Sequence, residues 1–419
     1  MRINHNVAAL NTYRQLTVAN NAATKAMEKL SSGLGINKAG DNAAGLAISE
    51  KMRGQIRGLD QASRNAQDGI SLIQTAEGAL NETHAILQRM RELAVQSAND
   101  TYTEVDRSEI QKEIDQLSQE LSRIGSTTEF NTQKLLNGNF KGTFHIGANE
   151  NQSLSLEVGD MRGFALGMAG DAKLEVTADV TDASDGNVDL VDGVYQVKAN
   201  SSGTYDLVNA DGVVIATSDA DAKIFTAATG DDTITFDEAV TSGTVEIDEG
   251  TATAVGTVSN SGLEAGSYTY VEAENALKDA NGNVVAKSTD GATFTTLDGS
   301  KELVKFSQAL TDGDKFEVGG IDVSSQTSAN GAITRIQTAI ETVSAERSKL
   351  GAYQNRLEHT INNLGASSEN LTAAESRIRD VDMAKEMMEF TRANILSQAA
   401  QAMLAQANQL PQGVLQLLR

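Results

Sequence analysis

The chain of 419 residues contains no cysteine, no tryptophan and a single proline. Without cysteine it has no disulfide bond, no thiol nucleophile and no cysteine-ligated metal site. The histidines, at positions 5, 84, 145 and 359, are scattered, and the sequence has no HExxH pair, phosphate-binding loop or GxSxG motif. We therefore predict no catalytic residue, no metal site and no cofactor, and we expect that the protein is not an enzyme.

The scarcity of proline also bears on architecture. At an average usage of about 5%, a chain of this length would contain about twenty prolines, yet this one has 36 glycines and one proline. This imbalance favours long uninterrupted elements over a loop-rich fold. We expect Pro411 to mark the end of the last helix.

Positive charge is scarce as well. The sequence has 57 Asp and Glu against 34 Lys and Arg, a net charge of −23, which argues against nucleic acid or an anionic membrane surface as a partner. Residues 141–330 alone contain 32 acidic and 10 basic residues. The chain thus has a near-neutral start, an acidic middle and a near-neutral end.

Two apolar ladders with a seven-residue step lie at opposite ends of the chain. Such a repeat is typical of a supercoiling helix, and neither ladder can bury its stripe alone. We therefore predict that the two ends pack together as an antiparallel bundle, the alternative being two separate coiled-coil dimers. The predicted bundle core is Met52, Leu59, Ile73, Leu80, Leu87, Ile336, Val343, Leu350, Leu357, Leu364, Leu371 and Ile378.

The extreme termini carry little charge. Residues 393–418 contain no charged side chain, but eight amides interrupt this stretch, and amides are costly in hydrocarbon. We therefore predict no membrane insertion. Alanine- and amide-rich helical faces instead suit close packing between subunits.

The acidic middle has the signature of β structure. Asx-Gly pairs, such as those at 211–212 and 281–282, separate short β-branched runs, which predicts hairpins in one or two β-rich domains. The predicted cores contain Tyr195, Tyr205, Tyr268, Tyr270, Phe294 and Phe306. Overall we predict an α+β, multidomain fold in which the β-rich middle is inserted into a helical bundle.

Acidic side chains of the middle raise two further possibilities. Asp279, Asn281, Asn283 and Asp290 partly match a calcium loop, but Val284 stands at the glycine position and the last ligand is Asp, so a hairpin is favoured. The pairs at 231–232 and 237–238 are expected to be surface charges and not catalytic carboxylates.

Several segments of the two ends resemble bacterial flagellin. They are MRINHNVAAL at 1–10, LSSGL at 30–34, AAGLAISEKMRGQIRGL at 43–59, RELAVQSAN at 91–99, GAYQNRLEH at 351–359 and QANQLPQGVLQLLR at 406–419. The resemblance covers roughly residues 1–140 and 330–419, and the middle shows no match.

This resemblance implies a structural subunit of the swimming filament, located outside the cell. Such subunits are exported through the flagellar type III apparatus and form a helical homopolymer of eleven protofilaments. It implies three domains: 1–42 with 380–419 lining the channel, 43–140 with 330–379 as the bundle, and 141–329 facing solvent. Expected filament contacts are Ile3, Val7, Leu10, Met388, Ile395, Leu396, Met403 and Leu410.

The resemblance also implies partners. They are the export chaperone, which would bind a segment like 380–419, the export gate, and the filament cap and hook-junction proteins. The vertebrate Toll-like receptor for flagellin would contact Gln88, Arg89, Leu93 and Glu113. A segment sensed by plants would fall near 28–49.

Two residues of that segment depart from the family pattern. Gly35 stands where arginine is usual, and Asn42 where aspartate is usual. Both changes remove charge, which puts plant recognition in doubt. We further expect Gly35 to loosen the link between terminal helix and bundle, since glycine costs about 1 kcal/mol inside a helix.

Three alternatives remain. The first is a hook–filament junction protein of the same superfamily. The second is an outer domain that also acts as an adhesin, which the aromatic content of 4% does not favour. The third is a metallopeptidase insert, which would need two histidines and a glutamate at HExxH spacing; the middle contains only His145.

Overall fold

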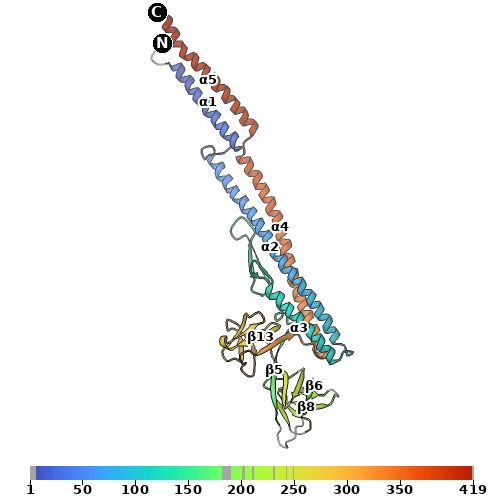
Figure 1. Ribbon diagram of the computed structural model, residues 1–419. Helices are drawn as coiled ribbons and strands as arrows, with labels where there is room; N and C mark the ends of the chain where they lie inside the picture. Colours follow the sequence, from blue (N-terminus) through green and yellow to red (C-terminus); the bar gives the residue numbers. More distant parts are fainter. Residues whose placement is uncertain are drawn as a thin grey trace. The chain divides into compact units, whose positions relative to one another are not determined.

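A computed structural model describes residues 6–417, apart from 182–189, 201–202, 210–211, 230–231, 242 and 249; for position 199 and residues 410–417 it describes the backbone alone. Long helices occupy both ends of the chain, and strands fill the middle (Figure 1). The helices are α1 (Val7–Ser32), α2 (Ala43–Ser97), α3 (Glu104–Thr127), α4 (Gln326–Arg379), α5 (Met383–Leu417) and the 3₁₀ helix η1 (Glu272–Glu274). The predicted α+β class, with a β-rich insertion between helical ends, is confirmed.

The strands follow α3 and end before α4. They are β1 (Glu129–Phe130), β2 (Gln133–Lys134), β3 (Lys141–His145), β4 (Ser153–Glu157), β5 (Ala169–Thr181), β6 (Gly193–Ala199), β7 (Tyr205–Val208), β8 (Val214–Ser218), β9 (Ile224–Ala227), β10 (Thr233–Thr235), β11 (Thr244–Asp248), β12 (Thr251–Val258), β13 (Gly266–Val271), β14 (Ala276–Asp279), β15 (Val284–Ser288), β16 (Thr293–Thr295), β17 (Glu302–Lys305) and β18 (Lys315–Gly320).

The last helix is longer than the sequence predicts. Pro411 lies within α5, which continues to Leu417, so the expectation that this proline ends the helix was wrong. Proline removes one backbone donor from a helix, and here the helix continues past that missing bond.

By internal contacts the chain forms two compact units. The first comprises Met1–Ile70, Thr143–Ser155 and Asn355–Arg419, and the second comprises Ser71–Gly142 and Leu156–Gln354. Both α2 and α4 therefore contribute to each unit.

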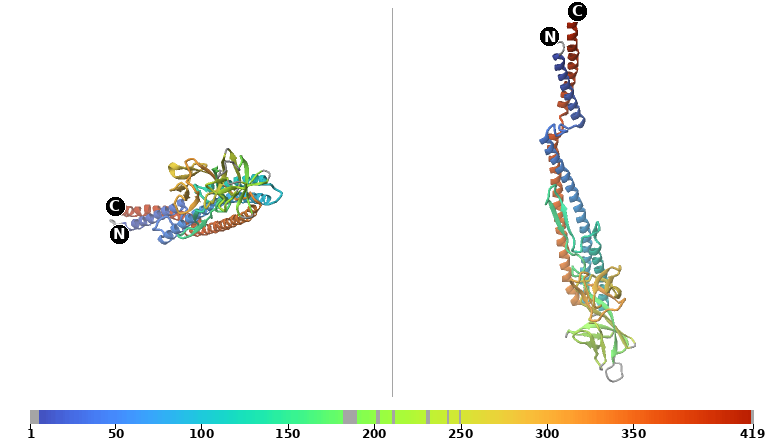
Figure 2. Two further views of the ribbon diagram at one scale, coloured as in Figure 1. Left: turned by 90° about the horizontal axis from the view of Figure 1, so that it is seen from below. Right: turned by 90° about the vertical axis from the view of Figure 1, so that its left-hand side faces the viewer.

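In the first unit, α1 lies alongside α5 in both views, and the start of α2 lies alongside the end of α4 (Figures 1 and 2). Glycines of α2 admit the end of β3 and the segment that follows it. A Cβ at Gly58 would lie 3.0 Å from Ala148, and one at Gly69 would lie 3.2 Å from the Phe144 ring. Asn65 Nδ2 donates to the His145 carbonyl at 3.0 Å, which fixes this segment on the helix.

In the second unit, the remainder of α2 packs with α3 and with the start of α4 (Figure 2). The centre of the predicted bundle core is buried throughout: Ile73, Leu80, Leu87, Ile336, Val343 and Leu350 are at most 1% exposed. The outer members of both ladders lie in the first unit. There Leu357 and Leu364 are buried, whereas Met52, Leu59, Leu371 and Ile378 are half-buried.

In the described residues, β1 pairs with β2 and β3 with β4, and the strands from β5 to β18 form an antiparallel sheet of 14 strands in the order β10-β9-β8-β7-β6-β11-β12-β5-β18-β13-β14-β15-β16-β17. A further pairing of β10 with β5 closes its first eight strands into a ring. Ring closure leaves those strands without open edges. The sheet encloses two hydrophobic cores, one around Phe225 and Phe236 and one around Phe294, Phe306 and Phe316.

The predicted aromatic core residues lie in these two cores. Tyr268, Tyr270, Phe294 and Phe306 belong to one, and Tyr195 belongs to the other. Tyr205 is only half-buried and packs against the core around Phe225 and Phe236.

The turn from β14 to β15 is the predicted hairpin. Asp279 Oδ1 accepts the N–H groups of Asn281 at 2.9 Å and Asn283 at 2.8 Å, and Gly282 has a φ of 81°. The carboxylate thus organises the turn, and no cluster of metal-binding side chains occurs within the described residues.

The expectation that the acidic pairs are surface charges was wrong for two residues. Asp232 and Glu238 are buried. Asp232 accepts the Leu190 N–H at 3.3 Å, and Glu238 accepts the N–H and O–H of Ser307. These bonds replace the water lost on burial. Asp231 lies outside the described residues.

A polar stripe on α3 holds both ends of the insert. Gln111 donates to the Ile321 carbonyl at 3.2 Å and accepts the Val323 N–H at 2.7 Å. One turn on, Asp115 accepts the Gly320 N–H at 2.7 Å, and Ser118 donates to the Met168 carbonyl at 2.8 Å. The spacing of three or four residues places these side chains on one helical face.

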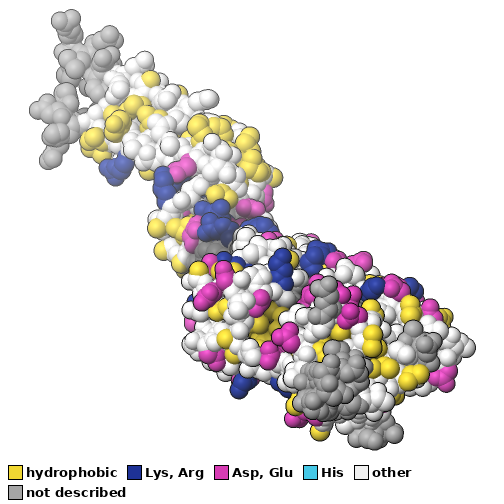
Figure 3. Space-filling model, turned by 60° about the horizontal axis from the view of Figure 1, so that its bottom comes forward, with side chains coloured by type: hydrophobic (Ala, Val, Ile, Leu, Met, Phe, Trp, Pro, Cys, Tyr) yellow, Lys and Arg dark blue, Asp and Glu magenta, His cyan; other side chains and the backbone are white. Residues whose placement is uncertain are grey.

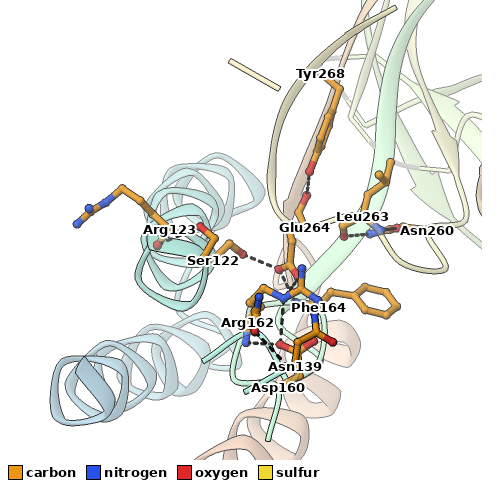
Figure 4. A network of polar contacts seen from close by, with 12 residues as sticks. Ser122, Arg123, Asn139, Asp160, Arg162, Phe164, Asn260, Leu263, Glu264 and Tyr268 are labelled. Carbon is orange, nitrogen blue, oxygen red and sulfur yellow. Dashed lines mark hydrogen bonds and ion pairs between the residues drawn. The ribbon is translucent and has the colours of Figure 1, made fainter. Parts of the chain in front are cut away.

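Ser122, one turn beyond Ser118, extends the stripe and contacts the half-buried carboxylate of Glu264 (Figure 4). Its Oε2 accepts the Ser122 hydroxyl and the Phe164 N–H, both at 2.9 Å. Arg162, itself paired with Asp160 at 2.7 Å, lies 3.6 Å from its Oε1. Burial raises the pKa of Glu264 despite these contacts, which favour the charged form.

Candidate functional site

The terminal pair, formed by α1 and α5, joins through small residues. Ala19 and Ala26 of α1 are buried, as are Ala393, Ala400 and Ala407 of α5, all at most 9% exposed. Each set repeats every seven residues, the spacing of a helix–helix seam. Alanine lets the two helices approach closely, but it buries little apolar area.

Polar contacts complete the pairing of these helices. The Asn6 side chain caps α1 by accepting the Ala9 N–H at 3.0 Å, and it also donates to the Ala407 carbonyl at 2.8 Å. Ser397 donates to the Asn20 side chain at 2.7 Å. These bonds fix which faces of α1 and α5 meet, and therefore which faces are left outside.

Hydrophobic side chains gather on the surface of this pair (Figure 3), and the described filament contacts are exposed there. Val7, Leu10, Met388, Ile395, Leu396 and Met403 are between 51% and 68% exposed. Ile3 lies outside the described residues, and so does the side chain of Leu410. Sequence reasoning missed five further exposed residues of these helices: Tyr13, Val18, Met27, Met383 and Met387.

Two grooves mark this apolar surface. One of about 470 Å³ follows a single face of α5 and is lined by Met387, Met388, Ile395 and Leu396, among others. A second of about 590 Å³ lies between α1 and α5. Large exposed apolar patches are typical of interaction sites.

Gly35 and its neighbours connect α1 to the start of α2. α1 ends at Ser32, with Gly33 in the left-handed region at φ 72°. Gly35 donates its N–H to the Arg379 carbonyl at 2.6 Å, and Val381 donates to the Gly33 carbonyl at 3.1 Å. The backbone between α1 and α2 is thus bridged directly to that between α4 and α5.

The expectation that Gly35 loosens this link was therefore wrong. Gly35 lies outside any helix, and a Cβ there would lie 3.2 Å from the Asp380 carbonyl oxygen. The expected cost of glycine inside a helix therefore does not apply at this position. Asn42 accepts the Gly45 N–H at 2.9 Å, a capping role that asparagine fills as well as aspartate does.

The predicted receptor residues lie in the second unit. Gln88, Arg89 and Glu113 are exposed, and Arg89 binds Glu113 Oε1 through two nitrogens at 2.9 and 2.8 Å. Leu93 is only 2% exposed. Three of the four side chains are thus available to a partner, and the fourth packs inside the bundle beneath them.

Comparison with known proteins gives consistent matches. The bacterial flagellin N-terminal helical region matches residues 3–141, and the bacterial flagellin C-terminal helical region matches residues 333–418. A flagellin of Clostridium tyrobutyricum is 49% identical over 98% of this chain and 99% of its own length. A flagellin of Bacillus subtilis is 43% identical over 100% of both.

Solved structures add little beyond this. The crystal structure of Bacillus cereus flagellin covers 74% of this chain and 94% of its own, at 16% identity and a TM-score of 0.32. So low a score carries no argument. None of the described helices is long and apolar enough to cross a membrane.

Proposed function

The chain belongs to the bacterial flagellin family, and we propose that it polymerises through the apolar outer faces of α1 and α5. Its function is that of a structural subunit of the flagellar filament. The observation that carries the proposed surface is the inverted burial of the terminal pair, in which alanines are buried and large apolar side chains are exposed. A neighbouring subunit would cover these side chains and release the water around them.

The same surface accounts for the finer expectations. Residues 1–42 with 380–419 would line the channel, 43–140 with 330–379 would form the surrounding shell, and 141–329 would face solvent outside the cell. Before assembly, the groove on α5 along Met388 and Ile395 offers an export chaperone a site that keeps the subunit from polymerising early. The export gate, the filament cap and the hook-junction proteins complete the proposed partners.

A vertebrate Toll-like receptor is proposed as a partner of the exposed surface around Arg89. The ion pair of Arg89 with Glu113 holds two charged side chains of α2 and α3 in one place. Arg89→Ala should therefore weaken signalling in a receptor reporter assay, whereas Arg123→Ala, which removes another exposed ion pair of α3, should leave it unchanged. A silent reporter with the parent protein would exclude this partner.

Truncation tests the proposed division of labour. Ala169 and Gly320 are paired in neighbouring strands, so a chain lacking residues 170–319 can be closed without stretching. We expect this chain to polymerise on seeds, as seen by negative-stain microscopy. Chains lacking the first or the last thirty residues should form no filaments.

The outcome separates the alternatives. Filaments of normal length from an end-truncated chain would contradict the proposed surface. A hook-junction protein would label only the filament base in immunogold microscopy, whereas a filament subunit labels its whole length. An adhesin role would appear as lost surface attachment in the chain lacking 170–319, and no catalytic activity is proposed.

A further inference from the structure

The strand order of the insert is palindromic. Counted inward from each edge of the sheet, the order is five consecutive strands that run back and forth, then the next strand of the chain, and then one of two central strands. One half of the sheet consists of β6 to β10 and β11. The other half consists of β13 to β17 and β18. The two central strands are β12 and β5. We call β6–β11 the first module and β13–β18 the second, and β5 and β12 their leading strands.

Buried residues of the two modules correspond in sequence. They occur as equivalent pairs 69 to 73 positions apart: Tyr195 and Tyr268, Leu207 and Leu277, Ala216 and Ala286, Ser218 and Ser288, Phe225 and Phe294, Phe236 and Phe306, Val240 and Leu310. The apolar members of these pairs belong to the core of their own module. The two modules therefore share a side-chain pattern as well as a strand order.

Hydrogen bonds outside the ladders correspond in the same way. Phe236 donates its N–H to the Lys223 carbonyl at 2.9 Å, and Phe306 donates to that of Ala292 at 3.0 Å. The Tyr195 hydroxyl donates to the carbonyl four residues earlier at 2.6 Å, and Tyr268 does so at 2.8 Å. These local bonds are independent of the sheet order and repeat in both modules.

The leading strands relate the modules by a two-fold axis. Val245 of the first module lies opposite Ala254 of β12, and the equivalent Phe316 lies opposite Leu174 of β5. Ala254 and Leu174 are therefore equivalent positions. Within the β5–β12 pair, Ala254 lies opposite Val176 and Leu174 lies opposite Gly256, which is the register that a two-fold axis at Glu175 and Val255 requires.

Two further contacts obey the same axis. Val180 of β5 pairs with Ile234, and Asn260, which follows β12, pairs with Val304. Equivalent turns of the two modules also meet each other: Gln308 donates to Asp237 at 2.8 Å, and Ser307 donates to Glu238 at 2.9 Å. Contact between equivalent surfaces is the mark of an isologous pair.

We propose that residues 169–320 are two copies of one β module, and that the leading-strand edge of each copy is a self-recognition surface whose partner is the same edge of a second copy. In this chain the second copy is covalently attached, so every leading edge is paired internally. A chain with one module would expose that edge and take its partner from another chain, by main-chain hydrogen bonds.

Deletion of residues 174–253 tests this inference. It joins Lys173 to Ala254, the equivalent of Leu174, and leaves one module. In the unpolymerised protein this chain should have twice the monomer mass by light scattering. Val255 should then lie opposite its own copy, with Cα atoms about 5 Å apart, close enough for a disulfide. Since the chain has no cysteine, Val255→Cys should give a covalent dimer on oxidation.

Thr257→Cys is the matched control on the same face of the strand. In the proposed register it lies four residues from its own copy, about 13 Å away, and should not crosslink. Val255→Cys in the undeleted chain should not crosslink either, because Glu175 already occupies the opposing place.

The reciprocal deletion of residues 249–319 keeps the first module and makes the test independent of one junction. There Glu175→Cys should crosslink and Lys173→Cys should not. An insert that stays monomeric or unfolded at every protein concentration in both deletions would overturn the proposal. Equal crosslinking of the test and control cysteines would overturn it as well.

Discussion

The terminal pair and the insert bury opposite kinds of residue. α1 and α5 meet through alanines and leave Leu10, Met388 and Ile395 exposed. The insert encloses phenylalanines such as Phe294 and Phe306 and closes part of its sheet into a ring. A region that keeps its large apolar side chains outside is incomplete without a partner, whereas one that encloses them is complete alone.

Charge follows the same division. Residues 141–330 contain most of the excess of acidic over basic residues, while the last 26 positions before the C-terminal arginine contain no charge. Acidic surfaces repel one another, so we expect inserts of adjacent subunits to stay apart while the near-neutral ends make contact. Assembly and solubility would then depend on different parts of one chain.

The largest effect is expected from a charge placed on the exposed apolar face of the terminal pair. Ile395→Asp should abolish polymerisation, since a carboxylate buried in a subunit interface without a partner costs several kcal/mol. The free subunit should keep its helix content by circular dichroism, because Ile395 is 60% exposed. Val213→Asp, at a 55% exposed position of the insert, is the control and should polymerise normally.

The converse substitution is made in the insert. Phe306→Ala removes a ring lying 5.9 Å from Phe294 and 5.0 Å from Phe316, and should lower the free energy of unfolding of the insert by about 3–5 kcal/mol. Urea unfolding followed by tyrosine fluorescence measures this loss, and filament formation should persist. Leu297→Ala, at a 58% exposed position, should change stability by less than about 0.5 kcal/mol.

The helical part of the molecule is the part that sequence reasoning predicts well. A seven-residue step of large apolar residues, such as Ile73, Leu80 and Leu87, has few interpretations other than a helix with a buried stripe. The fold class and the outward stripe of Met388 and Ile395 follow from the same periodicity. The alanine seam has the same spacing at Ala393, Ala400 and Ala407, but alanines are too frequent in these helices for the pattern to be noticed.

The insert is the part that the sequence predicts least. Glu238 is buried and Glu264 is half-buried, although both lie in an acidic segment and nothing local marks them as such. Only the folded chain supplies Ser307 and Ser122 as their partners. The internal repeat is concealed because its spacing is not constant: it is 69 to 73 residues within the modules and 80 between the leading strands. Buried positions and exposed turn glycines, such as Gly212 with Gly282 and Gly243 with Gly313, preserve it.

Overpacking the alanine seam tests the terminal pair more finely. Ala400→Leu adds three carbons between α1 and α5 and should destabilise their pairing by about 1–3 kcal/mol. Thermal unfolding followed by helical circular dichroism should show an earlier loss of terminal helix. Gln401→Leu adds a similar side chain on the exposed neighbouring face and should not. Equal melting of the two variants would contradict the seam.

The smallest expected effect concerns the pH dependence of the insert. Burial raises the pKa of Glu264 above its ordinary value of 4.5, so the folded state holds this proton at pH values where the unfolded state has lost it. Stability should therefore fall as the pH rises through the raised pKa, and increase again on return toward 4.5. At lower pH the trend reverses, because hydrogen bonds lower the pKa of carboxylates such as Asp290 and Asp298 in the folded state.

Glu264→Gln removes the titration but keeps an oxygen that can accept from Ser122 and Phe164. It gives up the contact with Arg162, which retains Asp160, so the change in stability at neutral pH should be below about 1 kcal/mol. Urea unfolding of both proteins from about pH 8 to about pH 5 should show the parent gaining stability relative to the variant as the pH falls. A difference that stays constant across this range would mean that Glu264 is ionised throughout. The charged carboxylate would then hold the insert to the polar stripe of α3, as Asp115 does. Its environment would not favour the protonated form.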